Sequence, residues 1–219
     1  MFLLGALAAS PALVFGHGWW LLAWPAAAFW FVALAYFTAS PGLLGKRPDG
    51  SISPVHVLLL LPYFGIVWTR WWLTNRLTRE PVWNEVVPGL FVGRFPAAGQ
   101  VPDAAQLVVD LTSEFPRAPS IGAGREYICV PSLDYETPPE TEFLIAALEL
   151  AARSVPMYVH CAFGHGRAPA MVAAILVRRR AVRSIPEAVA LLKTARPRVG
   201  LDGPQLRVLQ RLEPQLLGP

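Results

Sequence analysis

One segment constrains the fold more than any other, because residues 155–179 read as a buried strand, a short loop with two glycines and a helix. Residues 155–159 are mostly apolar, and residues 167–179 carry Ala, Met, Val, Ile and Leu at helical spacing. A tight connection from a buried strand to a helix is typical of layered α/β domains. We therefore expect a central sheet with helices packed against it.

The remaining periodic segments extend this prediction over residues 80–219. Further strands are predicted at residues 90–92, 106–111 and 127–130, and further helices at residues 141–153, 185–195 and 204–212. Residues 74–88, which include Pro81, are predicted to be a linker. The region of residues 80–219 has about 140 residues, which is enough for one hydrophobic core.

The loop between the strand and the helix has the composition of an anion site built around a thiol. Gly164 and Gly166 allow the backbone to curl so that successive amides point inward, and the following helix adds its positive N-terminal end. This field favours a thiolate at Cys161, and Arg167 offers a planar guanidinium for two phosphoryl oxygens. The pattern predicts a nucleophilic cysteine that attacks phosphorus. Alternatively, Cys161 is a small core residue and Arg167 a surface residue.

Together, His160, Cys161, five further residues and Arg167 resemble the signature loop of the cysteine-based dual-specificity phosphatases, within the protein tyrosine phosphatase superfamily. The resemblance spans about residues 83–212 and implies a mostly parallel sheet flanked by helices, with neither metal nor cofactor. It also implies that His160 is buried and supports the cysteine, although a plain core histidine is the alternative. The phosphate-binding residues that it implies are Ala162, Phe163, Gly164, His165, Gly166 and Arg167.

Such phosphatases need a general acid, which the family takes from a loop upstream of the cysteine. Asp134 is the best candidate, because it lies in a proline-bracketed turn at residues 130–139, between a predicted strand and a predicted helix. An Asx turn or a helix cap is the alternative for Asp134. Asp110 is the weaker candidate for the general acid, because an aspartate in such a strand more often supports the ends of strands. Cys129 is either a plain core cysteine or the partner of Cys161 in a disulfide that forms under oxidation.

Ala168 departs from the family pattern, because most members carry Ser or Thr after the arginine. The run from Gly166 to Pro169 is similar to the phosphatases of regenerating liver, a subgroup that has alanine there. Because the hydroxyl helps the thiolate leave, its loss predicts slow breakdown of a phosphocysteine. One alternative is therefore a low-turnover, pseudophosphatase-like binding module for a membrane partner. A separate alternative is a rhodanese-like sulfurtransferase, which also places a cysteine in a short amide-lined loop.

The first 45 residues contain no Asp, Glu, Lys or Arg. A helix of that length would extend about 67 Å, roughly twice the hydrocarbon thickness, so one pass fits poorly. We predict a helical hairpin with limbs at residues 2–15 and 19–37, followed by a third helix over residues 55–67 that spans or lies on the membrane. The predicted domains are thus a membrane region, residues 1–79, and a cysteine phosphatase domain, residues 80–219.

The charge distribution supports contact with a bilayer. The chain has a net charge of +4, and all of this excess belongs to residues 1–79. The basic side chains of that region, which we expect to form a collar near the bilayer surface, are Lys46, Arg47, Arg70, Arg76 and Arg79. The charge-balanced remainder argues against nucleic acid as a partner.

A nucleophilic thiol requires a reducing compartment, so the catalytic domain is expected to face the cytoplasm. We accordingly predict a multi-pass protein of the cell membrane that acts on a phosphorylated protein or lipid. The sequence gives no indication of oligomeric state.

Overall fold

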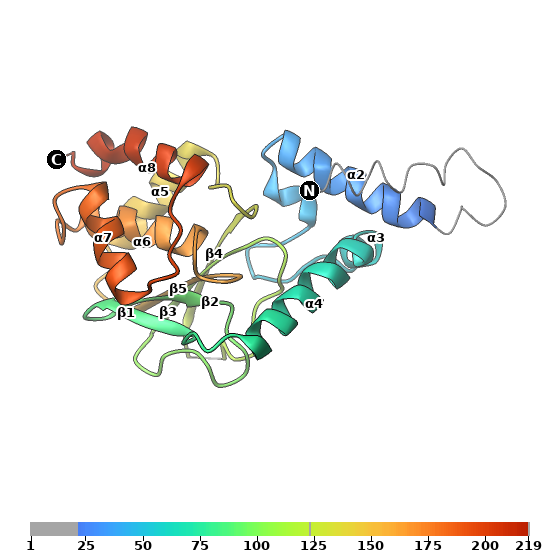
Figure 1. Ribbon diagram of the computed structural model, residues 1–219, viewed down its shortest axis with the longest axis horizontal. Coiled ribbons are helices and arrows are strands. Elements are labelled where there is room, and N and C mark those ends of the chain that lie inside the picture. Colours follow the sequence, from blue (N-terminus) through green and yellow to red (C-terminus); the bar gives the residue numbers. More distant parts are fainter. Residues whose placement is uncertain (1–21, 123, 219) are drawn as a thin grey trace. The chain divides into compact units, whose positions relative to one another are not determined.

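The computed structural model describes residues 22–122 and 124–218 (Figure 1). The chain divides into two compact units. The first runs to Thr78 and also includes Ser113–Pro116, and the second comprises Arg79–Thr112 and the residues from Arg117 onward. The predicted limb at residues 2–15 lies outside the described residues.

The second unit is built on a mixed sheet with the strand order β1-β2-β5-β3-β4. Its strands are β1 (Trp83–Val87), β2 (Leu90–Arg94), β3 (Leu107–Thr112), β4 (Glu126–Ser132) and β5 (Met157–Cys161). Only the pairing of β1 with β2 is antiparallel among the described strands. The central strands β5 and β3 are buried along their whole length, as expected for parallel strands covered on both faces.

Four helices complete this unit and pack together beside the sheet (Figure 1). They are α5 (Glu140–Ala151), α6 (Arg167–Arg178), α7 (Ile185–Ala195) and α8 (Gly203–Leu216). Every residue of α6 from Arg167 to Val177 is buried, because the helix lies against β5 and β2 and also contacts the other three helices. This central position fixes the loop that leads from β5 into α6.

The first unit contains three helices and a short 3-10 turn, η3 (Pro41–Leu44), among its described residues. Helix α2 (Ala23–Phe37) packs against α4 (Leu61–Leu77), which continues from the short helix α3 (Pro54–Leu59). The Trp24 indole donates to the Leu59 carbonyl over 3.0 Å, and the Trp68 indole donates to the Glu114 carbonyl over 2.9 Å. The second bond, together with the contact of the Trp71 ring with Phe115, joins residues 113–116 to this unit.

The structure confirms the predicted α/β fold and corrects one segment. Residues 74–88 are not a linker, because α4 continues to Leu77 and β1 occupies Trp83–Val87. This strand forms by pairing with β2 at the edge of the sheet. In the first unit, the predicted helices at residues 19–37 and 55–67 correspond to α2 and to α3 with α4. No helix within residues 22–122 and 124–218 has both the length and the apolar character needed to cross a membrane.

Candidate active site

Cys161 is the last residue of β5, the middle strand of the sheet, and the residue is only 3% exposed. Its Sγ accepts a hydrogen bond from the Gly164 amide at 3.2 Å. The loop that begins here ends at Gly166, which caps the N-terminus of α6. The sulfur therefore lies at the carboxyl edge of parallel strands, where such sheets bind ligands.

The loop's carbonyls are all held from outside the loop or by α6. The Ala162 carbonyl accepts from the Phe95 amide at 3.2 Å, and the His165 carbonyl accepts from the Gly200 amide at 2.9 Å. The Gly166 carbonyl accepts from the Ala170 amide of α6 at 2.9 Å. Because a trans peptide points its N–H opposite to its C=O, carbonyls held outward turn the following amides inward. The loop is thus a cradle of amide dipoles suited to an anion.

The two remaining carbonyls bind one buried guanidinium that the sequence did not single out. Arg196 follows α7, is fully buried, and donates to the Gly164 carbonyl at 3.1 Å and to the Phe163 carbonyl at 3.2 Å. Burial lowers the pKa of Arg196. An arginine at a helix end is ordinarily a surface residue, so no local pattern distinguishes this one.

Gly164 is required by both conformation and space. Its φ of +74° lies in the left-handed region, and a Cβ there would come within 2.5 Å of the Gly93 carbonyl carbon on β2. Only glycine therefore allows the loop to pack this closely on the neighbouring strand.

Arg167, at the start of α6, is also buried. Its Nη1 donates to the Ser132 carbonyl at 2.9 Å and to the Leu111 carbonyl at 3.4 Å, at the ends of β4 and β3. Its Nη2 lies 3.3 Å from Asp134 Oδ1. The structure thus brings two of the predicted catalytic residues, Arg167 and Asp134, into contact, and places Cys161 at the other end of the same loop.

Asp134 lies in the turn after β4, and its side chain is 39% exposed. The next residue, Tyr135, has a φ of +64°, which is uncommon for a residue other than glycine. Across this turn, the buried Gln205 side chain donates to the Glu136 carbonyl at 3.2 Å. A Cβ on Gly166 would lie 2.7 Å from Gln205 Oε1, so Gln205 lies between the loop of residues 162–166 and the Asp134 turn.

His160 is fully buried, with its ring against Phe95 and Tyr158. Its Nδ1 lies 3.9 Å from Asp110 Oδ1. The Asp110 carboxylate is itself held by the amide and hydroxyl of Thr112, at 2.8 and 2.7 Å, and by the Tyr127 hydroxyl at 2.8 Å. Burial, followed by the charge of Asp110, raises the pKa of Tyr127. These contacts connect β3 with its neighbours β4 and β5.

Both cysteines lie within the described part of the chain, and neither is in a disulfide. Cys129 is on β4, which β3 separates from β5. Two strand spacings amount to about 10 Å, beyond the roughly 7 Å over which two Cα atoms can be bridged. The possible disulfide is therefore not compatible with this sheet.

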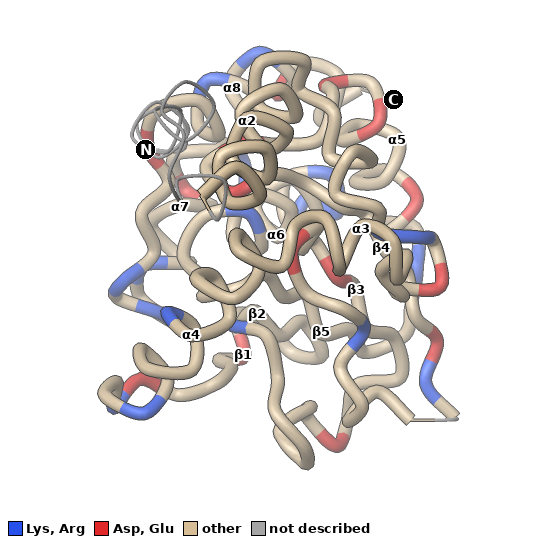
Figure 2. The backbone as a smooth tube through the Cα atoms, turned by 90° about the vertical axis from the view of Figure 1, so that its right-hand side faces the viewer, with Lys and Arg blue, Asp and Glu red and all other residues tan. Residues whose placement is uncertain are grey.

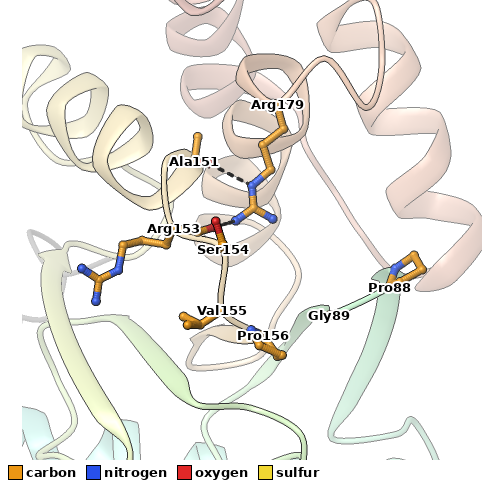
Figure 3. A pocket seen from close by; sticks show the side chains of 8 residues that line it. All are labelled: Pro88, Gly89, Ala151, Arg153, Ser154, Val155, Pro156 and Arg179. Atoms are coloured by element: carbon orange, nitrogen blue, oxygen red, sulfur yellow. Dashed lines mark hydrogen bonds between the residues drawn. The ribbon is translucent and has the colours of Figure 1, made fainter.

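A hollow of about 320 Å³ lies at the opposite end of the strands from Cys161. Figure 3 shows Arg179 above it, donating to the Ala151 carbonyl at 3.1 Å at the end of α5. Because it lies at the opposite strand ends, the hollow is not part of the cysteine site. Among the described residues, no group of His, Cys, Asp or Glu could hold a metal ion.

Residues 102–181 match the Tc-R-P family, described as "Polymorphic toxin system, DSP-PTPase phosphatase". No curated protein matches the sequence of the chain.

Solved structures match about three fifths of this chain over most of their own length. A mouse protein described as a dual specificity phosphatase, crystallised with zinc tungstate, is 30% identical with a TM-score of 0.51, and the match covers 64% of this chain and 91% of that one. Human DUSP28 is 28% identical with a TM-score of 0.50, covering 63% and 97%. The active form of Tk-PTP is 25% identical with a TM-score of 0.54, covering 62% and 98%.

The close approach of the loop to β2 generates a test. Gly164→Ala is expected to lower the free energy of unfolding by about 2 kcal/mol, because it forces a strained φ and a contact with β2. It should also abolish binding of tungstate, a phosphate mimic, measured by calorimetry. The matched control is Gly200→Ala, since a Cβ there meets no heavy atom within 4 Å. Equal stability of the two variants in urea would contradict the assignment.

Proposed function

The chain belongs to the cysteine-based dual-specificity phosphatases of the protein tyrosine phosphatase superfamily, and we propose that it is a membrane-anchored member that hydrolyses phosphate monoesters through a phosphocysteine. The observation that carries the proposal is the loop itself, in which amides turn inward around Cys161 while Arg167 contacts Asp134. The alternative of a sulfurtransferase receives no support from the relatives.

In the proposed first step, the thiolate of Cys161 attacks phosphorus and the bond from phosphorus to the leaving oxygen breaks. Loop amides and Arg167 hold the other phosphoryl oxygens, and Asp134 gives its proton to the leaving oxygen. In the second step, water attacks phosphorus, Asp134 takes the proton, and the S–P bond breaks to release inorganic phosphate and the thiolate. Arg167 can serve both steps because carbonyls at the ends of β3 and β4 fix one of its nitrogens.

The second step is proposed to be the slower one. Ala168 directly follows Arg167 and is fully buried in α6. Its methyl group can donate no hydrogen bond to the departing thiolate, whereas a serine or threonine hydroxyl could. Slow turnover favours accumulation of the phosphocysteine, which is also what a low-turnover binding module would show.

The substrate class follows from the charge of the loop. His165 is the only titratable side chain at residues 162–166, and its Nε2 lies 2.7 Å from a Glu80 carboxylate oxygen. The loop therefore offers little additional positive charge to a second phosphate group. We propose a monoester of low charge, either on a membrane-associated protein or on a lipid.

Anchoring is proposed from the helices of the first unit and from the absence of charged residues in its first 45 positions. Helix α2 carries no charged residue (Figure 2), yet Trp24, Trp30 and Leu34 are exposed on it. In α4, the Arg76 guanidinium lies 4.3 Å from the centroid of the Trp72 ring, a pair suited to the headgroup region. Lys46 is buried, so it does not belong to the predicted basic collar. The proposed orientation places the catalytic unit in the cytoplasm.

The nucleophile is tested by Cys161→Ser with an aryl phosphate. Hydrolysis is expected to fall by about 10³-fold or more, because a serine hydroxyl is not ionised in this loop. Cys129→Ser is the matched control and should retain activity. With the unaltered chain, a burst of phenol followed by a slow steady rate would identify phosphocysteine breakdown as limiting. Undiminished hydrolysis by Cys161→Ser would exclude the thiol as nucleophile.

The role of Asp134 is tested by comparing substrates whose leaving groups differ in their need for a proton. Asp134→Asn is expected to lower kcat by about 10²-fold for an alkyl phosphate, whose leaving oxygen needs a proton. The loss should be much smaller for p-nitrophenyl phosphate, whose leaving group is a weak base. Asp103→Asn, at an exposed aspartate, is the control. An equal loss with both substrates would argue against a general acid.

Anchoring is tested by carbonate extraction of cell membranes. The full chain should stay in the membrane pellet, because its apolar helices are embedded. Combining Trp30→Arg with Leu34→Arg should release it, since each cation in hydrocarbon costs about 2.5–3.5 kcal/mol. Ala190→Arg, on the exposed side of α7, is the control. A chain that washes off without these substitutions would refute the proposed anchor.

A further inference from the structure

Glu80 lies three residues after the end of α4, yet its side chain is only 11% exposed. One oxygen of its carboxylate, Oε2, lies 2.7 Å from His165 Nε2 in the phosphate loop. The other, Oε1, lies 3.3 Å from Arg196 Nε. One carboxylate thus bridges a side chain of the loop and the guanidinium that holds the loop's carbonyls.

Arg196 extends this connection to the segment around Glu80. Its Nη1 donates to the Pro81 carbonyl at 3.0 Å and to Asn84 Oδ1 on β1 at 2.8 Å. The same guanidinium therefore binds residues 81–84 on one side and the carbonyls of Phe163 and Gly164 on the other. Burial lowers the pKa of Arg196, and the charge of Glu80 acts in the opposite direction.

We propose that Glu80 is a positioning residue for the phosphate loop. It holds Arg196 as a buried cation and His165 in place, and through them it keeps the loop's carbonyls outward and its amides inward. Because Glu80 belongs to the short connection that follows α4, this connection is part of the support of the active site. The inference rests on the proposed function in that the aligned amides are those that would bind the phosphoryl group.

Positioning and simple electrostatics predict opposite effects when the charge of Glu80 is removed. A carboxylate near the loop repels an incoming anion, so its loss alone would tighten anion binding, and added salt would diminish this effect. If Glu80 aligns the loop, its loss weakens anion binding, because Arg196 no longer has its counter-charge and its contacts shift. The sign of the change therefore distinguishes the two.

The experiment compares Glu80→Gln with Glu85→Gln in the full chain. Glu85 is a suitable control because it lies on β1 and its carboxylate binds the Gly89 amide, at the other end of β2 from the loop. Tungstate affinity is measured by calorimetry at about 0.05 M and about 0.5 M salt. Glu80→Gln should weaken binding about tenfold at both salt concentrations, while Glu85→Gln should not change it. Unchanged or tighter binding by Glu80→Gln would overturn the proposal.

Asn84→Ala keeps the test decisive if Glu80→Gln does not fold. It removes one hydrogen bond to Arg196 without changing any charge, so about threefold weaker tungstate binding is expected. Unchanged binding would again overturn the proposal. Aryl phosphate hydrolysis is followed in parallel. If tungstate binding depends on Glu80 but the ester is not hydrolysed, the proposed function is refuted and the positioning role of Glu80 stands. If the ester is hydrolysed equally well with and without Glu80, the positioning role is refuted and the proposed function stands.

Discussion

The site depends on where the carbonyls of one loop point. A short loop between a strand and a helix has as many acceptors as donors, and it binds an anion only if the acceptors are held away from it. Arg196 donates hydrogen bonds to two of these carbonyls, and backbone amides outside the loop donate to two more. The arrangement uses a buried cation to orient dipoles rather than to contact the anion itself. The central burial of α6 fixes the end of the loop in the same way.

The second buried arginine has a different task. Arg167 uses one nitrogen to bind carbonyls at the ends of β3 and β4 and presents another to Asp134. Because β3, β4 and β5 are parallel, their carboxyl ends meet at one edge, so residues far apart in sequence come together there. Asp110 of β3 also connects the three strands, because it accepts hydrogen bonds from Thr112 and from Tyr127 of β4 and lies near His160 of β5. The parallel direction of these strands therefore brings the proposed catalytic residues together.

The α/β fold and the cysteine loop could be predicted because their signals are local. An apolar strand, two glycines and a helical repeat lie within residues 155–179. Strand β1 was missed because Pro81 and Pro88 bracket it and because it forms only by pairing with β2. Arg196 was missed because its burial comes from segments distant in sequence. Lys46 was expected at a bilayer surface and is instead buried, since periodicity does not show how a turn folds back.

The connection after α4 also determines where the catalytic unit begins. The resemblance to known phosphatases starts near Trp83, and the matched family model starts at residue 102. A fragment cut at either point would lose Glu80 and Pro81, two of the groups around Arg196. A fragment cut near Trp83 would keep the five strands and four helices while its loop loses contacts that shape it, whereas a fragment cut at residue 102 would also lose β1 and β2. The shortest version that keeps these contacts begins at Glu80, so homology alone gives a misleading boundary for expression.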